Sequence, residues 1–254
     1  MSEPVNPYQK PEVVRHYGKL RHLFAAERHF LERHKDRLEK FMLLDVGIGA
    51  GRTTRHFAPL VRHYVGIDYA KPMIQWCQNH LPQWDHVTLQ VMDARQLQFA
   101  DAAFDVVLFS FNGIDCVSYQ DREKILKEFY RVLKPGGMLL FSFHNANSIQ
   151  RLYALQWPRN PFKWCWELRR RRQLYQRNGP WQHYVDKQFF HIYDGSDDFA
   201  TLVCYVKPEV QWADLRKIGF TALRAYNLET GQPIAEEALP TASDQWIFVV
   251  AQKP

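Results

Sequence analysis

The chain has 254 residues, 46% hydrophobic and 15% aromatic, which is enough for a sizeable core and excludes a mainly disordered protein. Its net charge of +6 is compatible with an acidic substrate or with RNA, and it does not distinguish between these two kinds of partner. The four cysteines are scattered without a CxxC pair, so we expect neither a disulfide framework nor a metal site. The polar start and the lack of any apolar run of about 18 residues predict a soluble cytoplasmic protein with no membrane span.

The first predicted element is a helix over residues 11–38, in which apolar residues recur at spacings of three, four and seven. Tyr17 lies on this apolar stripe, and we interpret it as a core residue. Short apolar runs without clean alternation then follow, as is typical of strands buried on both faces of a parallel sheet. These runs are 41–46, 63–68, 87–92, 105–111 and 137–143.

Helices are predicted between the strands, at 51–60, 70–80 and 121–133. Strands that alternate with helices predict an α/β protein with a doubly wound, Rossmann-like sheet. The alternation stops after Phe143. It resumes with a helix at 208–218 and strands at 220–226 and 246–252.

The interrupting segment is rich in aromatic residues and contains four consecutive arginines, Arg169–Arg172. We expect one domain over 1–254, with a helical segment at 1–40 and an insertion at 145–207 that covers the carboxyl edge of the sheet as a substrate-binding lid. One helix cannot aim four consecutive arginines at one ligand. A solvated lid helix, anchored by Trp164 and Leu168, is therefore favoured over an anion-binding or RNA-binding face.

A glycine-rich turn follows the first predicted strand. Gly47, Gly49 and Gly51, with Asp45 before them, let the backbone approach a ligand closely at the start of a helix, where N–H groups can donate. The third glycine comes one residue too early for the GxGxxG pattern of dinucleotide-binding proteins, and no GxxxxGK[ST] phosphate loop is present. An NAD-dependent oxidoreductase is therefore the weaker alternative.

Acidic residues also end the next two strands, Asp68 in VGID and Asp93 in VMDA. A carboxylate at the position of Asp68 accepts hydrogen bonds from both hydroxyls of a ribose. Asp93 and the backbone N–H of Ala94 are placed to meet an adenine edge. Because the carboxyl ends of parallel strands share one edge, these groups and Asp45 favour an adenosyl cofactor that is cationic and lacks phosphates.

The ordered series DVGIGAG, GIDYAKPMI, MDA, FDVVLFSF and RVLKPGGMLLFSF resembles the motifs of class I S-adenosylmethionine (SAM)-dependent methyltransferases over residues 40–144. FSFNGID and FSFHN also resemble a bacterial subgroup of that superfamily. The resemblance implies SAM as the cofactor and a seven-stranded, mostly parallel sheet whose last strand is antiparallel. It implies a cofactor site at the matching positions: Asp45, Gly47, Gly49, Gly51, Asp68, Tyr69, Met73, Asp93, Ala94, Ser110 and Phe111.

Within that site the resemblance places the methionine moiety on Asp45 and the glycine backbone, and the adenine near Tyr69 and Met73. Ser110 and Phe111 would line the cofactor at the end of the fourth strand. Ordinary structural roles remain open, since Asp45 also suits a turn cap and Met73 a core position.

Methyl transfer from a sulfonium is an in-line displacement, so the enzyme mainly aligns the reactants and removes a proton where the nucleophile needs it. Candidate catalytic residues follow the fourth and fifth strands. Asn112 and Asp115 are candidates for orienting the substrate, and His144 is a candidate general base. Asp115 equally suits a helix cap, and His144 a hydrogen bond to backbone.

The favoured function is methyl transfer to an O or N nucleophile of a small molecule enclosed under the aromatic insertion. The basic charge and the arginine run leave RNA methylation as an alternative. Neither a [DNS]PP[YFW] motif after strand four nor a Pro-Cys nucleophile is present, which weakens a nucleic-acid substrate. A regulatory protein that binds SAM without turnover is a further alternative.

Overall fold

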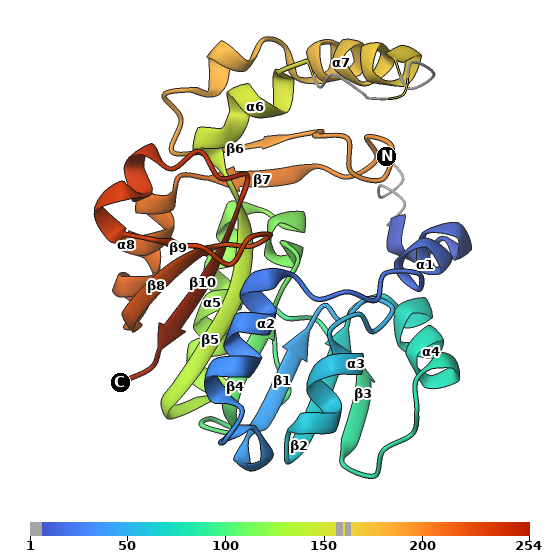
Figure 1. Ribbon diagram of the computed structural model, residues 1–254, viewed down its shortest axis with the longest axis vertical. Helices are drawn as coiled ribbons and strands as arrows, with labels where there is room; N and C mark the ends of the chain where they lie inside the picture. Colours follow the sequence, from blue (N-terminus) through green and yellow to red (C-terminus); the bar gives the residue numbers. More distant parts are fainter. Residues whose placement is uncertain (1–6, 156–159, 161–163) are drawn as a thin grey trace.

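The computed structural model describes residues 7–155, 160 and 164–254. Its centre is a mixed sheet with helices on both faces (Figure 1). The strands are β1 (Met42–Val46), β2 (His63–Asp68), β3 (Val87–Val91), β4 (Phe104–Phe109), β5 (Leu133–Asn145), β6 (Phe189–Ile192), β7 (Val203–Val206), β8 (Thr221–Asn227), β9 (Pro233–Ile234) and β10 (Trp246–Gln252). The helices are α1 (Pro11–Tyr17), α2 (Ala25–His34), α3 (Thr54–Phe57), α4 (Lys71–His80), α5 (Tyr119–Val132), α6 (Ile149–Tyr153), α7 (Trp164–Asn178) and α8 (Pro208–Ile218).

The main path of the sheet has the order β3-β2-β1-β4-β5-β10-β8-β9. Strands β1 to β5 pair in parallel, and β10 is antiparallel to both β5 and β8. This arrangement confirms the α/β, Rossmann-like fold and the antiparallel last strand. The predicted count of seven strands is wrong, because the described residues contribute ten. The extra strands are β9 and the hairpin β6–β7, which joins through parallel pairing of β7 with the end of β5.

The single helix predicted over 11–38 is also wrong, because the chain forms α1 and α2 with a break between them. Gly18 ends α1 and packs against the ring of Trp76 in α4. A Cβ atom at Gly18 would lie 2.4 Å from that ring, so only glycine allows this contact. The apolar spacing continues across the break, which is why it indicated one helix.

Each face of the sheet carries its own hydrophobic core. On one face, Phe30 of α2 and Phe57 of α3 pack against β1, β4, β5 and β10. On the other, Phe129 of α5 and Trp212 of α8 pack against the same central strands. This double coverage explains why the central strands read as continuous apolar runs. It leaves the carboxyl ends of the parallel strands free for a site.

Residues of the predicted insertion lie above that carboxyl edge (Figure 1). They have a separate core, in which Leu174 of α7 packs with residues of α6, β6 and β7. Arg170 is also buried and donates to the carboxylate of Glu167 at 2.8 Å. Leu168 is 55% exposed, so Leu174 and Arg170, and not Leu168, anchor α7.

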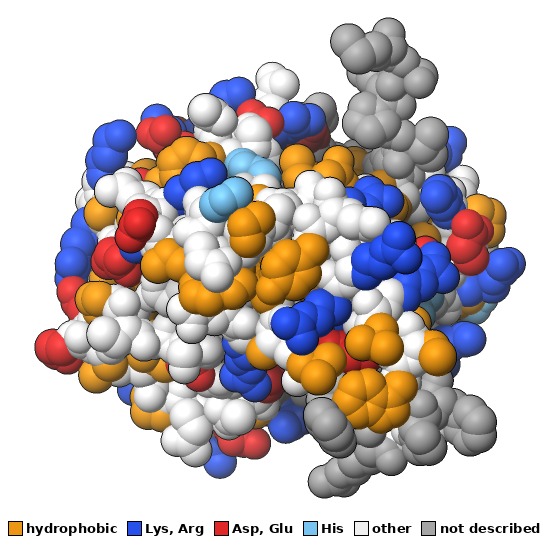
Figure 2. Space-filling model, turned by 90° about the horizontal axis from the view of Figure 1, so that it is seen from above, with side chains coloured by type: hydrophobic (Ala, Val, Ile, Leu, Met, Phe, Trp, Pro, Cys, Tyr) orange, Lys and Arg blue, Asp and Glu red, His pale blue; other side chains and the backbone are white. Residues whose placement is uncertain are grey.

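The outer face of this segment, seen from above in Figure 2, has hydrophobic side chains beside basic ones. Trp166, Leu168 and Tyr175 are its exposed large apolar residues on α7, next to the exposed Arg169 and Arg172. In the described part of the chain, no helix is both long and apolar enough to cross a membrane.

Candidate active site

The glycine turn after β1 adopts a backbone that side chains disfavour. Gly47, Gly49 and Gly51 have φ angles of 61°, 54° and 82°, all in the left-handed region. A Cβ atom would lie 2.6 Å from Phe109 at Gly47 and 2.8 Å from Leu81 at Gly51. At Gly49 the nearest atom would be Cδ1 of Tyr17 at 3.6 Å, an ordinary contact distance, so its φ angle and not crowding disfavours a side chain there.

A cavity of about 370 Å³ lies over this turn. It brings together ten of the eleven sequence-predicted cofactor residues, and the exception is Gly51, which packs beneath the turn. The ten are Asp45, Gly47, Gly49, Asp68, Tyr69, Met73, Asp93, Ala94, Ser110 and Phe111. Residues from four consecutive parallel strands therefore meet at one opening.

Asp68 closes β2 and is held by backbone donors. Its Oδ2 accepts from the N–H of Gly49 at 2.9 Å, and its Oδ1 accepts from the N–H of Ala70 at 2.8 Å. Burial raises the pKa of Asp68, and the two backbone bonds act in the opposite direction. Each oxygen can accept a further hydrogen bond. The carboxylate is thus fixed in place and still able to receive two hydroxyl donors.

Asp45 is held by side chains. The hydroxyls of Thr53 and Tyr64 both donate to its Oδ2, at 2.5 and 2.6 Å. Among the described residues its Oδ1 has no donor, and Asp45 lines the cavity. Burial raises the pKa of Asp45 to about 7. A buried carboxylate with one open oxygen is suited to a cationic group, and the donors that hold it are the side chains of Thr53 and Tyr64.

Asp93 lies at the rim of the cavity and is already engaged by Arg95. The guanidinium binds both carboxylate oxygens, with Nη2 at 2.6 Å from Oδ2. This contact lowers the pKa of Asp93. Arg95 lines the cavity as well, and the sequence interpretation did not include it. Any contact of Asp93 with an adenine edge is therefore shared with Arg95.

Met73 and Tyr69, which the sequence predicts to pack near an adenine, differ in their surroundings. Met73 is 1% exposed, so it serves the core and the cavity wall together. Tyr69 is 49% exposed and stands at the mouth. Tyr17, interpreted from the sequence as a core residue, also lines the cavity, where its ring faces Gly49.

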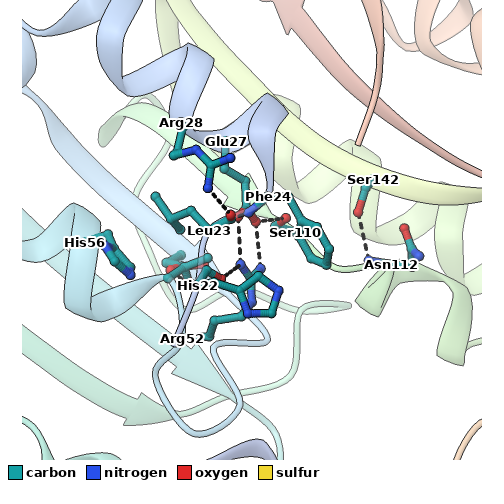
Figure 3. A network of polar contacts seen from close by, with 12 residues as sticks. His22, Leu23, Phe24, Glu27, Arg28, Arg52, His56, Ser110, Asn112 and Ser142 are labelled. Carbon is teal, nitrogen blue, oxygen red and sulfur yellow. Dashed lines mark hydrogen bonds and ion pairs between the residues drawn. The ribbon is translucent and has the colours of Figure 1, made fainter. Parts of the chain in front are cut away.

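A buried carboxylate on α2, missed by the sequence interpretation, connects two sides of the site (Figure 3). Glu27 is fully buried and binds the guanidinium of Arg52 through both oxygens, at 2.6 and 2.7 Å. The hydroxyl of Ser110 donates to the same carboxylate. Arg52 follows the glycine turn and Ser110 ends β4, so Glu27 holds these two walls together. The sequence did offer one sign of this role. Glu27 lies three residues after Phe24 and so shares the apolar, inward face of the helix, where a charged residue needs a partner.

Two of the predicted catalytic residues contact each other. Asp115 is fully buried, and its Oδ2 accepts from both the backbone N–H of His144, at 2.7 Å, and its ring Nδ1, at 2.8 Å. Its Oδ1 binds Arg122, which in turn donates to Gln211. Because the carboxylate only accepts, Nδ1 carries a proton and Nε2 is the acceptor in a neutral ring.

This pair lies behind the cavity wall. Neither Asp115 nor His144 lines the cavity, and the ring of Trp246 contacts both the ring of His144 and that of Phe111, which does line it. The Nε2 of His144 lies 3.7 Å from Oδ2 of Asp194, which belongs to the loop between β6 and β7. The ring nitrogen that would accept a proton is therefore turned toward the predicted lid.

Asn112, the third predicted catalytic residue, also does not line the cavity. It is 4% exposed, and its N–H donates to the hydroxyl of Ser142 at 2.8 Å (Figure 3). Its φ of 59° follows a φ of 58° at Phe111, and two successive left-handed non-glycine residues are strained. Its Oδ1 is buried without a hydrogen-bond partner among the described residues.

The wall opposite the glycine turn carries weakly acidic donors that the sequence interpretation missed. Tyr8 and Cys116 line the cavity, and the Tyr8 hydroxyl lies 3.4 Å from the Cys116 sulfur. Burial raises the pKa of Cys116 to about 12 and also raises the pKa of Tyr8 and Tyr17. These three groups are therefore neutral at physiological pH. Within the described residues, no group of three or more His, Cys, Asp or Glu side chains could hold a metal ion.

Comparison with known proteins agrees with this geometry. Residues 44–141 match the family model described as a methyltransferase domain. The chain is 31% identical over 106 residues to the uncharacterized methyltransferase YcgJ of Bacillus subtilis, covering 41% of each chain. It is 31% identical over 120 residues to a malonyl-[acyl-carrier protein] O-methyltransferase of Xylella fastidiosa, covering 46% of this chain and 39% of that one. The chain spans less than half the length of these relatives.

Solved structures show the same fold. A SAM-dependent methyltransferase from Mesorhizobium loti aligns with a TM-score of 0.62 at 17% identity, over 90% of this chain and 98% of that one. The N-methyltransferase NodS from Bradyrhizobium japonicum, in complex with S-adenosylhomocysteine, aligns with a TM-score of 0.53 at 14% identity, over 91% and 89%. A methyltransferase domain at residues 44–141 and the fold of SAM-dependent methyltransferases are therefore what this chain shares with known proteins. They support SAM as its cofactor, while the bacterial subgroup stays a prediction.

Proposed function

We propose that this protein transfers a methyl group from SAM to an O or N nucleophile of a small molecule. The observation that carries the proposal is the cavity that joins bare glycine backbone, the backbone-held Asp68 and the open oxygen of Asp45. These donors and acceptors match a cationic adenosyl ligand without phosphates. When bound, SAM would supply a methyl group activated by its sulfonium.

Asp68 would accept the ribose hydroxyls, and Asp45 with the backbone of Gly47 and Gly49 would hold the methionine moiety. Met73 and Tyr69 would pack on the adenine. Each assignment uses a group whose position is fixed by other contacts of this chain, so little ordering is needed on binding.

The acceptor would bind in the part of the cavity near Tyr8, Tyr17 and Cys116. A compact acceptor is supported by the closeness of the predicted lid, where His191 of β6 contacts the carbonyl oxygen of Val117 in the cavity wall at 3.4 Å. Enclosure of this kind limits water around the reacting atoms.

His144 is the proposed general base, with Asp115 as the residue that positions its ring. Asp115 fixes the tautomer that leaves Nε2 as the acceptor, which a base requires. Because His144 does not line the cavity, this role requires the reacting group of the acceptor to reach past the wall to Nε2, on the side where Asp194 lies 3.7 Å away. Asn112 does not line the cavity, so its proposed part is to position the turn after β4, whose Phe111 and Gly113 do line it.

The test is a screen with radiolabelled SAM against metabolite extracts and, separately, against total RNA. Label transfer to a small molecule is the expected result. Transfer to RNA alone would replace the acceptor proposed here, and SAM binding without transfer to any acceptor would favour a regulatory role. His144→Gln should then lower transfer to the identified small molecule without changing SAM affinity.

A further inference from the structure

A second cleft, of about 270 Å³, lies between α2 and the strands β5, β8 and β10, and it shares no lining residue with the methyl-transfer cavity. Figure 1 shows α2 lying in front of the central strands, with its N-terminal end toward the carboxyl edge of the sheet. The cleft lies alongside the rest of this helix. Its lining residues include five basic ones, His29, Arg33, His34, Arg37 and Arg224, and the phenol of Tyr226 is the other titratable group that lines it.

The arginines of this cleft form no ion pair with any described residue, which they share with several exposed arginines elsewhere, but here three of them line one cleft. Arg52, Arg95, Arg122, Arg131, Arg170 and Arg216 all form ion pairs. Among the described residues, Arg33, Arg37 and Arg224 form none, and no Asp or Glu lines the cleft. Three guanidinium groups therefore face one small space without a counter-charge from this chain.

His34 shows that these charges converge. It lies partly buried in the cleft, with its ring 4.5 Å from that of Phe30. Burial, followed by the positive charges of Arg33, Arg37 and Arg224, lowers the pKa of His34. Two of these arginines belong to α2 and the residues after it, whereas Arg224 belongs to β8. The cluster is assembled by the fold and is not a run of basic residues in the sequence.

Stabilisation of the helix dipole explains only part of this arrangement. Arg33 and His34 lie in the last turn of α2, where cations interact favourably with the helix C-terminus. That effect gives no reason for Arg224 to approach the same point from another element. Mutual repulsion of like charges is a cost that an anion in the cleft would remove.

We propose that this α2–β8 cleft binds a compact anion of the phosphate class. Guanidinium groups bind phosphate oxygens in pairs and in a fixed geometry. Met138, Phe248 and Val250 also line the cleft, whereas Arg33, Arg37 and Arg224 are exposed and free to reorient toward an anion. The anion is an inorganic phosphate or the phosphate group of a small metabolite.

The test is calorimetric titration of the full chain with pyrophosphate, with adenosine 5′-monophosphate as a second probe. The cleft variant is Arg33→Gln with Arg224→Gln, and the matched control is Arg169→Gln with Arg172→Gln, which removes the same charge from the exposed face of α7. We expect pyrophosphate binding to the native chain that weakens by about tenfold or more in the cleft variant, because charge-assisted bonds are lost. The control should bind as the native chain does.

Binding of adenosine monophosphate with the same variant dependence would identify a phosphorylated metabolite as the source, and binding of pyrophosphate alone an inorganic one. Equal loss in both variants would show non-specific charge attraction and overturn the proposal. Unchanged affinity in the cleft variant, or no pyrophosphate binding to the native chain, would do the same. A single-stranded RNA that binds with a steep salt dependence, while pyrophosphate does not bind, would replace the compact anion with a polymer. Thermal unfolding of each variant verifies that it is folded.

Discussion

Two buried carboxylates lie in different regions near the candidate site and are used differently. Asp68 ends β2, and Asp115 follows β4 and contacts His144 of β5. Asp68 is held by two backbone N–H groups and keeps acceptor capacity toward the cavity. Asp115 is saturated by His144 and Arg122 and lies behind the cavity wall. A strand-end carboxylate can therefore serve a ligand directly only when its holding contacts leave an oxygen open. The saturated one can act only through the side chain that it holds.

The largest effect is expected from Glu27, which connects the two regions through Arg52 and Ser110. Glu27→Ala leaves a buried guanidinium without its partner and should lower the free energy of unfolding by about 3–5 kcal/mol. Urea denaturation measures this value. Glu32→Ala, an exposed site on the same helix, is the control and should stay within about 0.5 kcal/mol of the native protein. A small effect at Glu27 would mean that the two regions are not joined through this residue.

The Asp115–His144 pair is tested by catalysis. For an acceptor that needs deprotonation, His144→Gln should lower kcat by about 100-fold, since general base catalysis contributes at least that much. The affinity for SAM should not change, because His144 does not line the cavity. Single-turnover kinetics and calorimetry measure the two quantities. Unchanged kcat would assign His144 to structure alone.

Asp68 is tested by binding. Asp68→Ala should weaken SAM binding by about 30-fold, or ~2 kcal/mol, the value of hydrogen bonds to a charged group. Asp121→Ala is the matched control, since this carboxylate lines the same cavity but binds Lys124 and is not assigned to the ribose. Equal losses in both variants would mean that the ribose is misplaced.

The pH dependence of SAM binding distinguishes Asp45 from the other carboxylates. Its pKa of about 7 means that it is largely protonated below neutrality, when it cannot attract a cationic group. SAM affinity should therefore rise by about tenfold between about pH 6 and about pH 8, and Asp45→Asn should remove this rise. Protonation of Asp45 favours the folded state below its unfolded pKa, and that contribution is lost as the pH rises through about 7. The stability of the native protein should thus fall, relative to Asp45→Asn, from pH 3.8 up to about 7 and level off above that, whereas SAM affinity continues to rise.

The smallest effect is expected at the exposed arginines of α7. Replacing Arg169 and Arg172 with Gln should leave KM for the small-molecule acceptor unchanged, as well as any salt dependence of RNA binding. Arg170 is already used inside the insertion, where it binds Glu167. A clear rise in KM, or loss of a steep salt dependence, would give α7 a direct part in substrate recognition.

The contrast between the two regions also explains what the sequence could predict. Asp45, Asp68 and Asp93 follow apolar strands directly, and parallel strands bring such positions to one edge, so local patterns located the cavity residues. Asp115 binds Arg122 and the more distant His144, and Arg122 in turn binds Gln211, so nothing near Asp115 in the sequence indicates the whole network. The ion pair of Glu27 with Arg52 joins α2 to the residues after the glycine turn, 25 positions along the chain, and the apolar spacing that indicated one helix gave no sign of it.

The central claim is that the cavity over the glycine turn binds an adenosyl sulfonium. Calorimetry of the native chain with SAM, S-adenosylhomocysteine and NAD tests it most directly. We predict saturable 1:1 binding of SAM and S-adenosylhomocysteine, weakened by Asp68→Ala, and no binding of NAD. Binding of NAD without binding of either sulfur nucleoside would contradict the account.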